Sequence, residues 1–480
     1  MINIRPLSFL LGLFLAVVAG LMLIPAGVSL YHAEGLAGEF FKSSMITFIA
    51  AMMAASTGFR SQLTLSTRDL YLFTTLTWVV VSLFAALPFT FYHHISYTDA
   101  FFETMSGITT TGSTVLSGLD DTAWSILIWR SLLQWLGGIG FIVMGVAIFP
   151  MLNVGGMRLF RTESSDWSDK WMPRTQLIGR GLVKVYLLLT ALCCLGYLAA
   201  GMTPFEAINH AMTTLSTGGY STTDSSMTHF STLAHWNGSL FMFLGGLPML
   251  IFVQMVHMRS VTVWNDQQVK GYLAFVICAS LLLGWWLSHQ QQMEFFPALT
   301  LATFNLISVV TTTGFASTDY SAWGPAASII FFFLMFVGAC SGSTSGAIKI
   351  FRFQLAGAVL HKALRQQIHP SALFPQRYNR RTISEDIVRS LVSFSMLFIA
   401  TIVVLALFLV LVGVDPVSSL TGAVTAVTNV GPGLGEVIGP AGNFASLPDA
   451  AKWALSLGML LGRLEIITVA VLLLPTFWRY

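Results

Sequence analysis

The chain alternates long apolar segments with shorter polar ones. A membrane-spanning helix needs about 20 consecutive, mostly apolar residues. Ten segments come close to that requirement, near residues 6–31, 43–59, 70–92, 124–150, 181–201, 236–258, 271–289, 323–348, 388–412 and 453–476. The pattern therefore predicts an all-α polytopic membrane protein with ten spanning helices.

Four shorter apolar pieces lie between these segments, at 99–108, 205–214, 297–310 and 417–427. Apolar runs of about 10–14 residues are typical of re-entrant segments. Each piece leads into a polar stretch that ends in glycine: Thr109-Thr110-Thr111-Gly112, Leu215-Ser216-Thr217-Gly218, Thr311-Thr312-Thr313-Gly314 and Thr428-Asn429-Val430-Gly431. Any one of them fits an ordinary amphipathic loop. Because the glycines follow one another at 106, 96 and 117 residues, we expect a repeat of helix, half-helix, polar turn and helix.

Composition supports a membrane protein. Hydrophobic residues make up 55% of the chain and charged residues 9%, against roughly 45–50% and 25% in soluble domains. The mean hydropathy is +0.74. We therefore expect the chain to lie in lipid.

The charged residues divide between two sets of loops. Loops 93–123, 202–235, 290–322 and 414–449 contain no Lys or Arg, yet they hold 11 of the 21 acidic residues. The basic residues gather in the opposite loops, at Arg158, Arg161, Lys170, Arg174, Arg180, Lys184, Arg352, Lys362, Arg365, Arg377, Arg380, Arg381 and Arg389. Since cytoplasmic loops are rich in Lys and Arg, we expect these loops and both termini in the cytoplasm, with the chain in a bacterial inner membrane. The net charge of +3 then follows from topology, and we expect no nucleic-acid partner.

The four stretches have the chemistry of a cation pathway. Irregular backbone at membrane depth is tolerated where it lines a watery cavity, and rings of backbone carbonyls replace the hydration shell of potassium in channels. Glycine allows the backbone angles that turn successive carbonyls toward an axis. The C-terminus of each half-helix carries about −0.5 charge, and acidic outer loops concentrate cations. The pattern predicts one central pore.

Several motifs, in order along the chain, resemble a known family. Asp99-Ala100-Phe101-Phe102-Glu103 precedes the first stretch and Leu133-Gln134-Trp135-Leu136-Gly137-Gly138 follows it. Later motifs are Thr312-Thr313-Gly314-Phe315, Asn429-Val430-Gly431-Pro432-Gly433-Leu434-Gly435, Gly462-Arg463-Leu464-Glu465 and Pro475-Thr476-Phe477-Trp478-Arg479. Together they are similar to the Trk/Ktr/HKT superfamily of potassium transporters, and within it to the bacterial TrkH/TrkG-type membrane subunit. The resemblance covers nearly the whole chain.

The resemblance implies two N-terminal helices and four pore repeats in a pseudo-fourfold arrangement around one pore. The expected units are 1–66 (extension), 67–151, 152–260 and 261–352 (repeats one to three), 353–386 (cytoplasmic basic linker) and 387–480 (repeat four). The resemblance also implies a potassium filter built from Thr110, Thr111, Gly112, Ser216, Thr217, Gly218, Thr312, Thr313, Gly314, Asn429, Val430 and Gly431. In the plant branch, serine in the place of Gly112 goes with sodium selectivity, so glycine indicates the potassium-selective form.

Residues 338–346, Gly-Ala-Cys-Ser-Gly-Ser-Thr-Ser-Gly, interrupt the apolar run of the third repeat. Glycine and hydroxyl residues are poor helix formers, so the sequence predicts a break in mid-membrane; a small-residue packing face is the alternative. The resemblance implies an intramembrane loop that acts as a gate. Its candidate residues are Gly338, Ser341, Gly342, Ser343, Thr344, Ser345, Gly346 and Arg463. Ser345 and Ala347 depart from the glycine-richer family pattern, and we expect them to stiffen the loop.

Two arginines inside apolar segments are candidate functional residues. A charge in mid-membrane usually faces protein or water. The resemblance implies that Arg463 points into the cavity under the filter, as a barrier or a seal. Residues two apart on a helix point to different faces, so Glu465 is expected to pair with another helix. Arg130 either snorkels outward or supports the first filter stretch through a salt bridge to Glu103 or Asp99.

The expected function is channel-like potassium uptake, with K⁺ as the transported ion and no bound cofactor. The resemblance implies a homodimer on a cytosolic TrkA-like ring of nucleotide-binding regulatory subunits, with 352–389 as the docking surface. A proton- or sodium-coupled symporter of the same fold is the alternative, and Glu465 is its candidate acid. A membrane enzyme is a third hypothesis, but the sequence offers neither paired carboxylates nor metal-ligand spacing for it.

Overall fold

The computed structural model describes residues 2–58, 65–93, 95–147, 175–258, 265–372, 374–379 and 381–479. The predicted repeat boundaries at 151/152 and 260/261 lie outside these residues. So do Arg158, Arg161, Lys170 and Arg174 of the first basic loop and Arg380 of the second.

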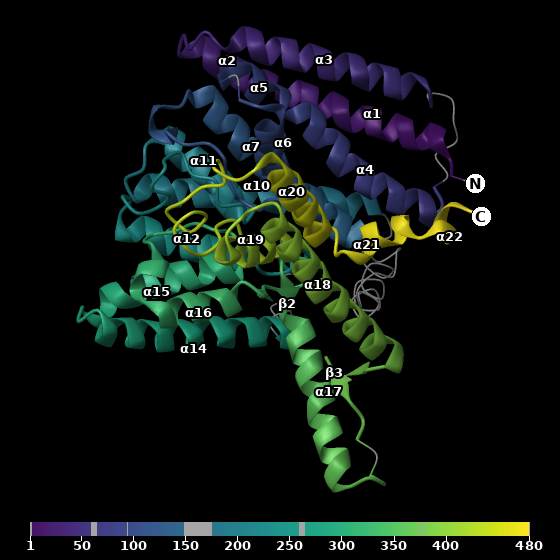
Figure 1. The fold of residues 1–480 in the computed structure, drawn as a ribbon, viewed down its shortest axis with the longest axis vertical. Helices are drawn as coiled ribbons and strands as arrows, with labels where there is room; N and C mark the ends of the chain where they lie inside the picture. The colour runs from purple at the N-terminus through teal and green to yellow at the C-terminus, as the bar shows by residue number, and fades with distance from the viewer. Residues whose placement is uncertain are drawn as a thin grey trace.

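The described chain is mostly helical, with almost no sheet (Figure 1). The first half contains α1 (Ile4–Leu21), α2 (Leu23–Tyr31), α3 (Ala37–Ser56), α4 (Thr67–Ala85), α5 (Leu87–His93), α6 (Tyr97–Ile108), η1 (Leu119–Asp121), α7 (Trp124–Ala147), α10 (Thr175–Ala199), α11 (Pro204–Leu215), α12 (Thr232–Gly245) and α13 (Met249–Met258). The second half contains α14 (Gln267–Gln290), α15 (Phe295–Val310), η3 (Tyr320–Trp323), α16 (Pro325–Leu334), α17 (Ile350–Ile368), α18 (Glu385–Leu411), α19 (Pro416–Thr428), α20 (Asp449–Arg463), α21 (Ile467–Ala470), η4 (Val471–Leu473) and α22 (Pro475–Trp478).

Two very short sheets complete the described structure. Strands β1 (Val337–Gly338) and β2 (Ile348–Lys349) pair in parallel, and β3 (Arg377–Tyr378) pairs with β4 (Arg381–Thr382) in antiparallel. The second sheet lies beside α17, which extends away from the helical body in Figure 1.

Fewer helices cross the membrane unbroken than the sequence predicted. Six described spans are long and apolar enough: Ile4–Tyr31, Thr67–Tyr92, Trp124–Ile142, Gly179–Ala199, Gln267–Gln290 and Glu385–Leu411. Two bent pairs raise the number to eight, α12 with α13 at 89° and α20 with the segment Ile467–Leu473 at 107°. The helix α3, which carries Glu39 and Lys42, is not among these spans.

Four of the ten predicted segments are therefore not among the continuous apolar spans: 43–59 forms the unbroken but more polar α3, and the other three are broken. The segments predicted at 236–258 and 453–476 are bent, and the segment predicted at 323–348 leaves the helix after Leu334. Pro248 lacks an N–H for the helical ladder and lies in the first bend. Glu465 and Ile466 adopt left-handed backbone angles (φ 60° and 45°) in the second.

The four short apolar pieces form the half-helices α6, α11, α15 and α19, as predicted. Three of the four have a side-chain cap: Ser96 accepts from Asp99 N on α6, Thr203 and Glu206 form a capping box on α11, and Asp415 accepts from Ser418 N on α19. Such caps satisfy N–H groups that have no partner within the helix. The half-helices also pack across repeats, α11 against α7, α15 against α12, and α6 against α20.

Two of the helices that follow a half-helix have a glycine where they pack against the C-terminal end of that half-helix. A Cβ built at Gly137 of α7 would lie 1.8 Å from the carbonyl oxygen of Ile108, and one at Gly462 of α20 would lie 1.9 Å from that of Val427. No side chain fits at such distances. The two glycines therefore allow each helix to lie directly against the C-terminal end of its half-helix.

Candidate ion pathway

The four polar stretches share one backbone conformation. Left-handed φ angles of 54°, 52°, 56° and 58° occur at Thr110, Thr217, Thr312 and Asn429. Two residues later, positive φ angles of 90°, 78°, 84° and 109° occur at Gly112, Gly219, Gly314 and Gly431. L-residues with a Cβ rarely adopt the second set of angles, so glycine is required there.

The backbone angles and hydrogen bonds shift the second stretch by one residue relative to the alignment expected from the sequence. Thr111, Gly218, Thr313 and Val430 each donate a backbone N–H to the carbonyl five residues earlier, at 2.9, 2.9, 2.8 and 3.1 Å. Gly218 is therefore equivalent to Thr111, and Gly219 is equivalent to Gly112. The four stretches listed from the sequence instead placed Gly218 in the position of Gly112. Two adjacent glycines are indistinguishable by composition, and only the backbone angles separate them.

The stretches contact one another in a closed order. A Cβ built at Gly112 would lie 2.3 Å from the Gly218 carbonyl oxygen, and one at Gly219 would lie 1.9 Å from that of Thr313. A Cβ at Gly314 would lie 2.2 Å from the Val430 oxygen, and one at Gly431 would lie 2.7 Å from that of Thr111. Each stretch thus meets the next, and the fourth returns to the first. Any residue larger than glycine would separate them.

Side-chain hydrogen bonds act both within single stretches and between the fourth stretch and the first. The Thr109 and Thr111 hydroxyls lie 2.7 Å apart, as do those of Thr311 and Thr313. Between the fourth and first stretches, Ser113 Oγ donates to the Gly431 carbonyl at 2.7 Å. These buried hydroxyls have partners within the protein, which holds the backbone of the stretches in place.

Arg130 forms the buried salt bridge that was one of its two predicted roles. Its Nε lies 2.8 Å from Glu103 Oε1, and the two residues are 1% and 0% exposed. Arg130 also donates to the Ser221 carbonyl at 3.0 Å, and Glu103 accepts from Val115 N at 3.0 Å. The pair therefore links the loops that leave the first and second stretches. Asp99, the other predicted partner, pairs with Lys452 instead.

The predicted break at 338–346 is confirmed, since α16 ends at Leu334 and α17 begins at Ile350. The intervening loop touches the ends of three half-helices. Thr344 Oγ1 donates to the Leu215 carbonyl at 3.3 Å, and Gly346 N donates to Thr312 Oγ1 at 2.7 Å. Ala347 N donates to the Thr428 carbonyl at 2.9 Å. The loop therefore closes against the stretches on the side where the half-helices end.

Arg463 reaches this loop from α20. Its Nη1 donates to the Thr344 carbonyl at 2.7 Å, and its guanidinium lies 4.0 Å from the Phe141 ring centroid. Its Nε and Nη2 have no hydrogen-bond partner among the described residues. Because a positive charge stacks favourably on an aromatic face, Phe141 and Thr344 together fix the guanidinium under the loop.

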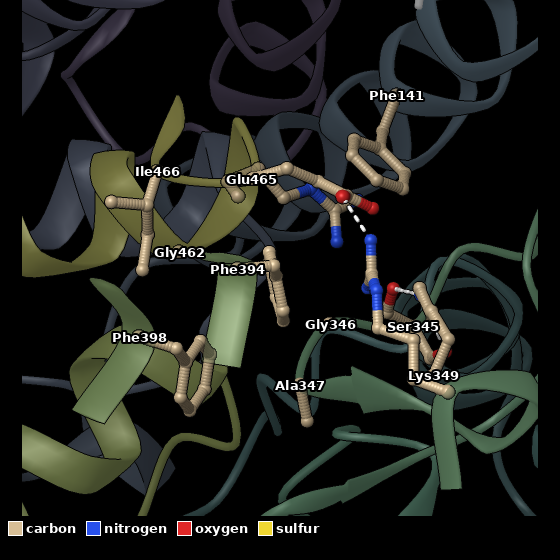
Figure 2. A pocket seen from close by; sticks show the side chains of 12 residues that line it. Phe141, Ser345, Gly346, Ala347, Lys349, Phe394, Phe398, Gly462, Glu465 and Ile466 are labelled. Atoms are coloured by element: carbon tan, nitrogen blue, oxygen red, sulfur yellow. Dashed lines mark hydrogen bonds and ion pairs between the residues drawn. The ribbon is translucent and has the colours of Figure 1, made fainter. Parts of the chain in front are cut away.

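A small pocket lies beside Arg463 (Figure 2). Glu465 and Phe141 lie on one side of it, and Ser345, Gly346 and Lys349 lie on the other. Glu465 pairs with Arg352 of α17, which confirms the expectation that it pairs with another helix. Lys349 donates to both the carbonyl and the hydroxyl of Ser345.

Sequence reasoning missed the burial of Lys349 and Arg352, which are 4% and 2% exposed. The sequence placed Arg352 in the basic set of cytoplasmic loops, and nothing in that pattern indicated that its side chain is buried. Both residues follow the 338–346 loop within one turn of α17, so their short distance from a membrane loop was an available signal. Gln134, a polar residue within apolar α7, was noted only as part of a motif, yet it is fully buried beside the second stretch.

Comparisons with known proteins agree with this geometry. The TrkH family, described as a cation transport protein, matches residues 37–480. The chain is 48% identical to the Trk system potassium uptake protein TrkI of Halomonas elongata, covering 99% of this chain and 97% of that one. It is 34% identical to the Trk system potassium uptake protein TrkH of Escherichia coli K12, covering 99% and 100%.

A solved structure has the same fold. The crystal structure of the potassium transporter TrkH from Vibrio parahaemolyticus superposes with a TM-score of 0.92 at 32% identity, covering 100% of both chains. The family match extends over most of the chain, and these relatives match along nearly their whole length. The protein therefore belongs to the TrkH family of cation transport proteins.

Proposed function

We propose that this protein carries potassium into the cell across the bacterial inner membrane, through a single pore that the four stretches surround in pseudo-fourfold symmetry. The relatives named potassium uptake proteins support the choice of ion. Main-chain carbonyls of the stretches replace the hydration shell of the ion, as in other potassium filters. We place the glycines of the filter at Gly112, Gly219, Gly314 and Gly431, with Gly218 one position earlier.

The closed order of contacts among the stretches carries this proposal. Three equivalent glycine-to-carbonyl approaches connect each stretch to the next one along the chain, and a fourth, from Gly431 to the Thr111 carbonyl, connects the last stretch back to the first. The half-helices α6, α11, α15 and α19 all end at these stretches. Their C-termini each contribute about −0.5 charge, which favours a cation there and disfavours an anion.

Rubidium uptake into proteoliposomes tests the filter. In Gly112→Ser the new side chain meets the Gly218 carbonyl oxygen 2.3 Å from its Cβ, so we expect the preference for rubidium over sodium to fall at least roughly tenfold. Gly140→Ser is the matched control, because no atom lies within 4 Å of a Cβ at Gly140. Unchanged selectivity in a folded Gly112→Ser protein would contradict the filter assignment.

The 338–346 loop and Arg463 form the gate in this proposal. Contacts of the loop with Leu215, Thr312 and Thr428 support it, because they occupy the space below three of the four stretches. A buried guanidinium held at Thr344 repels cations that arrive from the filter. We expect Arg463→Ala to raise the basal rubidium leak severalfold. A leak equal to that of the native protein would remove Arg463 from the gate.

The channel-like mode is favoured over symport by the position of Glu465. A coupling acid must take up and release its ion along the pathway, but Glu465 is held in an ion pair with Arg352. We therefore assign Glu465 a structural role beside the gate. No enzymatic reaction is proposed.

For the partners, we propose a homodimer that docks a cytosolic nucleotide-binding regulatory ring. Exposed basic residues on the projecting α17 and after it, Arg365, Arg377 and Arg389, support this surface. Arg352 is not part of the surface because it is buried. Pull-down of the purified regulatory subunit by native protein, compared with a triple Arg365→Ala/Arg377→Ala/Arg389→Ala variant, tests the docking site. Equal capture would contradict it.

A further inference from the structure

The second stretch differs from the other three at one equivalent position. Thr111, Thr313 and Val430 carry β-branched side chains there, whereas the second stretch has Gly218. A Cβ built at Gly218 would lie 2.4 Å from both Cδ and Oε1 of Gln134. The side chain of Gln134, which comes from α7 of the first repeat, therefore fills the place that a side chain of the stretch itself fills elsewhere.

Gln134 also holds the backbone of the second stretch on both sides of Gly219. Its Nε2 donates to the Gly218 carbonyl at 2.6 Å, and its Oε1 accepts from Tyr220 N at 3.0 Å. The carboxamide is 0% exposed. Only one orientation of the amide satisfies a carbonyl acceptor and an N–H donor together, so its direction is fixed by these two partners.

The hydrogen bonds of Gln134 continue through Tyr220 to the Arg130–Glu103 salt bridge. The Tyr220 hydroxyl donates to the Glu103 carbonyl at 2.7 Å, and the Arg130 guanidinium lies 4.1 Å from the Tyr220 ring centroid. Gln134, Tyr220 and Arg130 thus form one connected support between the first repeat and the second stretch. Two consecutive glycines would otherwise leave this stretch the most flexible of the four, because glycine has the most backbone freedom to lose.

We propose that Gln134 is a positioning residue for ion selectivity: its carboxamide fixes the Gly218–Tyr220 backbone of the second stretch in place of the missing β-branched side chain. This inference rests on the proposed function, since it assumes that the stretch borders the ion path. Gln134 acts through the backbone that it holds and need not touch the ion.

The ratio of rubidium to sodium uptake in proteoliposomes tests the proposal. Gln134→Met keeps the length and apolar volume of the side chain but loses both hydrogen bonds, and we expect the ratio to fall about tenfold. A purely structural role would lower the uptake of both ions together and leave their ratio unchanged. An unchanged ratio in Gln134→Met would overturn the proposal.

A rescue variant guards against misfolding of the single variants. Gly218→Thr alone should abolish uptake, because its Cβ overlaps Gln134. In the double variant Gln134→Ala/Gly218→Thr, the new threonine has the freed space and matches Thr111 and Thr313. We expect uptake to return and the ratio to exceed that of Gln134→Ala. A double variant no better than the worse single variant would contradict the space-filling role.

Gly112→Ser, measured alongside, separates this proposal from the proposed function. If Gly112→Ser leaves the ratio unchanged, the filter assignment itself fails. If Gly112→Ser lowers the ratio and Gln134→Met does not, the filter stands and only the positioning role of Gln134 is refuted.

Discussion

Asn429 and Thr111 are joined by a hydrogen bond of 2.9 Å between Nδ2 and Oγ1, although 318 residues separate them in the chain. Asn429 ends α19 in a left-handed conformation, and Nδ2 also donates to the Met459 carbonyl at 2.9 Å. The same side chain thus connects the fourth stretch to the first stretch and to α20. Asparagine suits this position because it tolerates the left-handed region better than most residues with a Cβ.

Replacement of Asn429 is expected to weaken the connection of the fourth stretch to the first stretch and to α20. Asn429→Ala loses two buried hydrogen bonds and places alanine at φ 58°, so we expect a loss of about 1–3 kcal/mol in stability and a lower rubidium-to-sodium ratio. Thermal unfolding of the purified protein and ion uptake measure the two effects. Asn443→Ala, at a loop position with one exposed hydrogen bond to Ala445 N, is the control and should change neither.

The Arg130–Glu103 pair should be far more costly to break than a surface pair. Removing one partner of a buried ion pair typically costs about 3–5 kcal/mol, and Arg130→Met leaves Glu103 buried at 0% exposure. Arg389→Met is the control, since the Arg389–Glu385 pair is exposed with a 3.7 Å separation and should be worth about 0–1 kcal/mol. Both values come from denaturation of detergent-solubilised protein, and similar losses would contradict the structural role of Arg130.

Ser345 is expected to slow opening of the 338–346 loop. Its hydroxyl lies 2.9 Å from Ser343 Oγ and accepts from Lys349 Nζ at 3.0 Å. Ser345→Gly removes both bonds and adds backbone freedom, so we expect a severalfold higher open probability in planar bilayers. Gly357→Ala on exposed α17, where no atom lies within 4 Å of a Cβ, should leave gating unchanged. A Ser345→Gly protein that opens as rarely as the native one would refute the stiffening role.

The position of Glu465 predicts how uptake responds to pH. Because Glu465 is paired with Arg352, we expect rubidium uptake from about pH 6 to about pH 8 to have the same profile in the native protein and in Glu465→Gln. The variant should instead lose stability, since it leaves Arg352 without its buried carboxylate. A native pH dependence that disappears in Glu465→Gln would favour the symport hypothesis.

The sequence alone was enough to place the half-helices that lead into the candidate pathway. Short apolar runs before Gly112, Gly314 and Gly431 specified half-helices and tight turns, because run length and glycine content are local properties. The break after Leu334 followed in the same way from the small and hydroxyl residues of the 338–346 loop.

Tertiary structure decided everything that depends on contact between distant segments. The choice between Gly218 and Gly219 required backbone angles, and the bend after Arg463 places Glu465 against Arg352 in a way that no spacing rule predicts. Asp99 has Lys452 rather than Arg130 as its partner because α20 packs against α6. Local sequence determines which conformations a segment can adopt, whereas the partner of a buried charge or amide is fixed only when remote helices pack together.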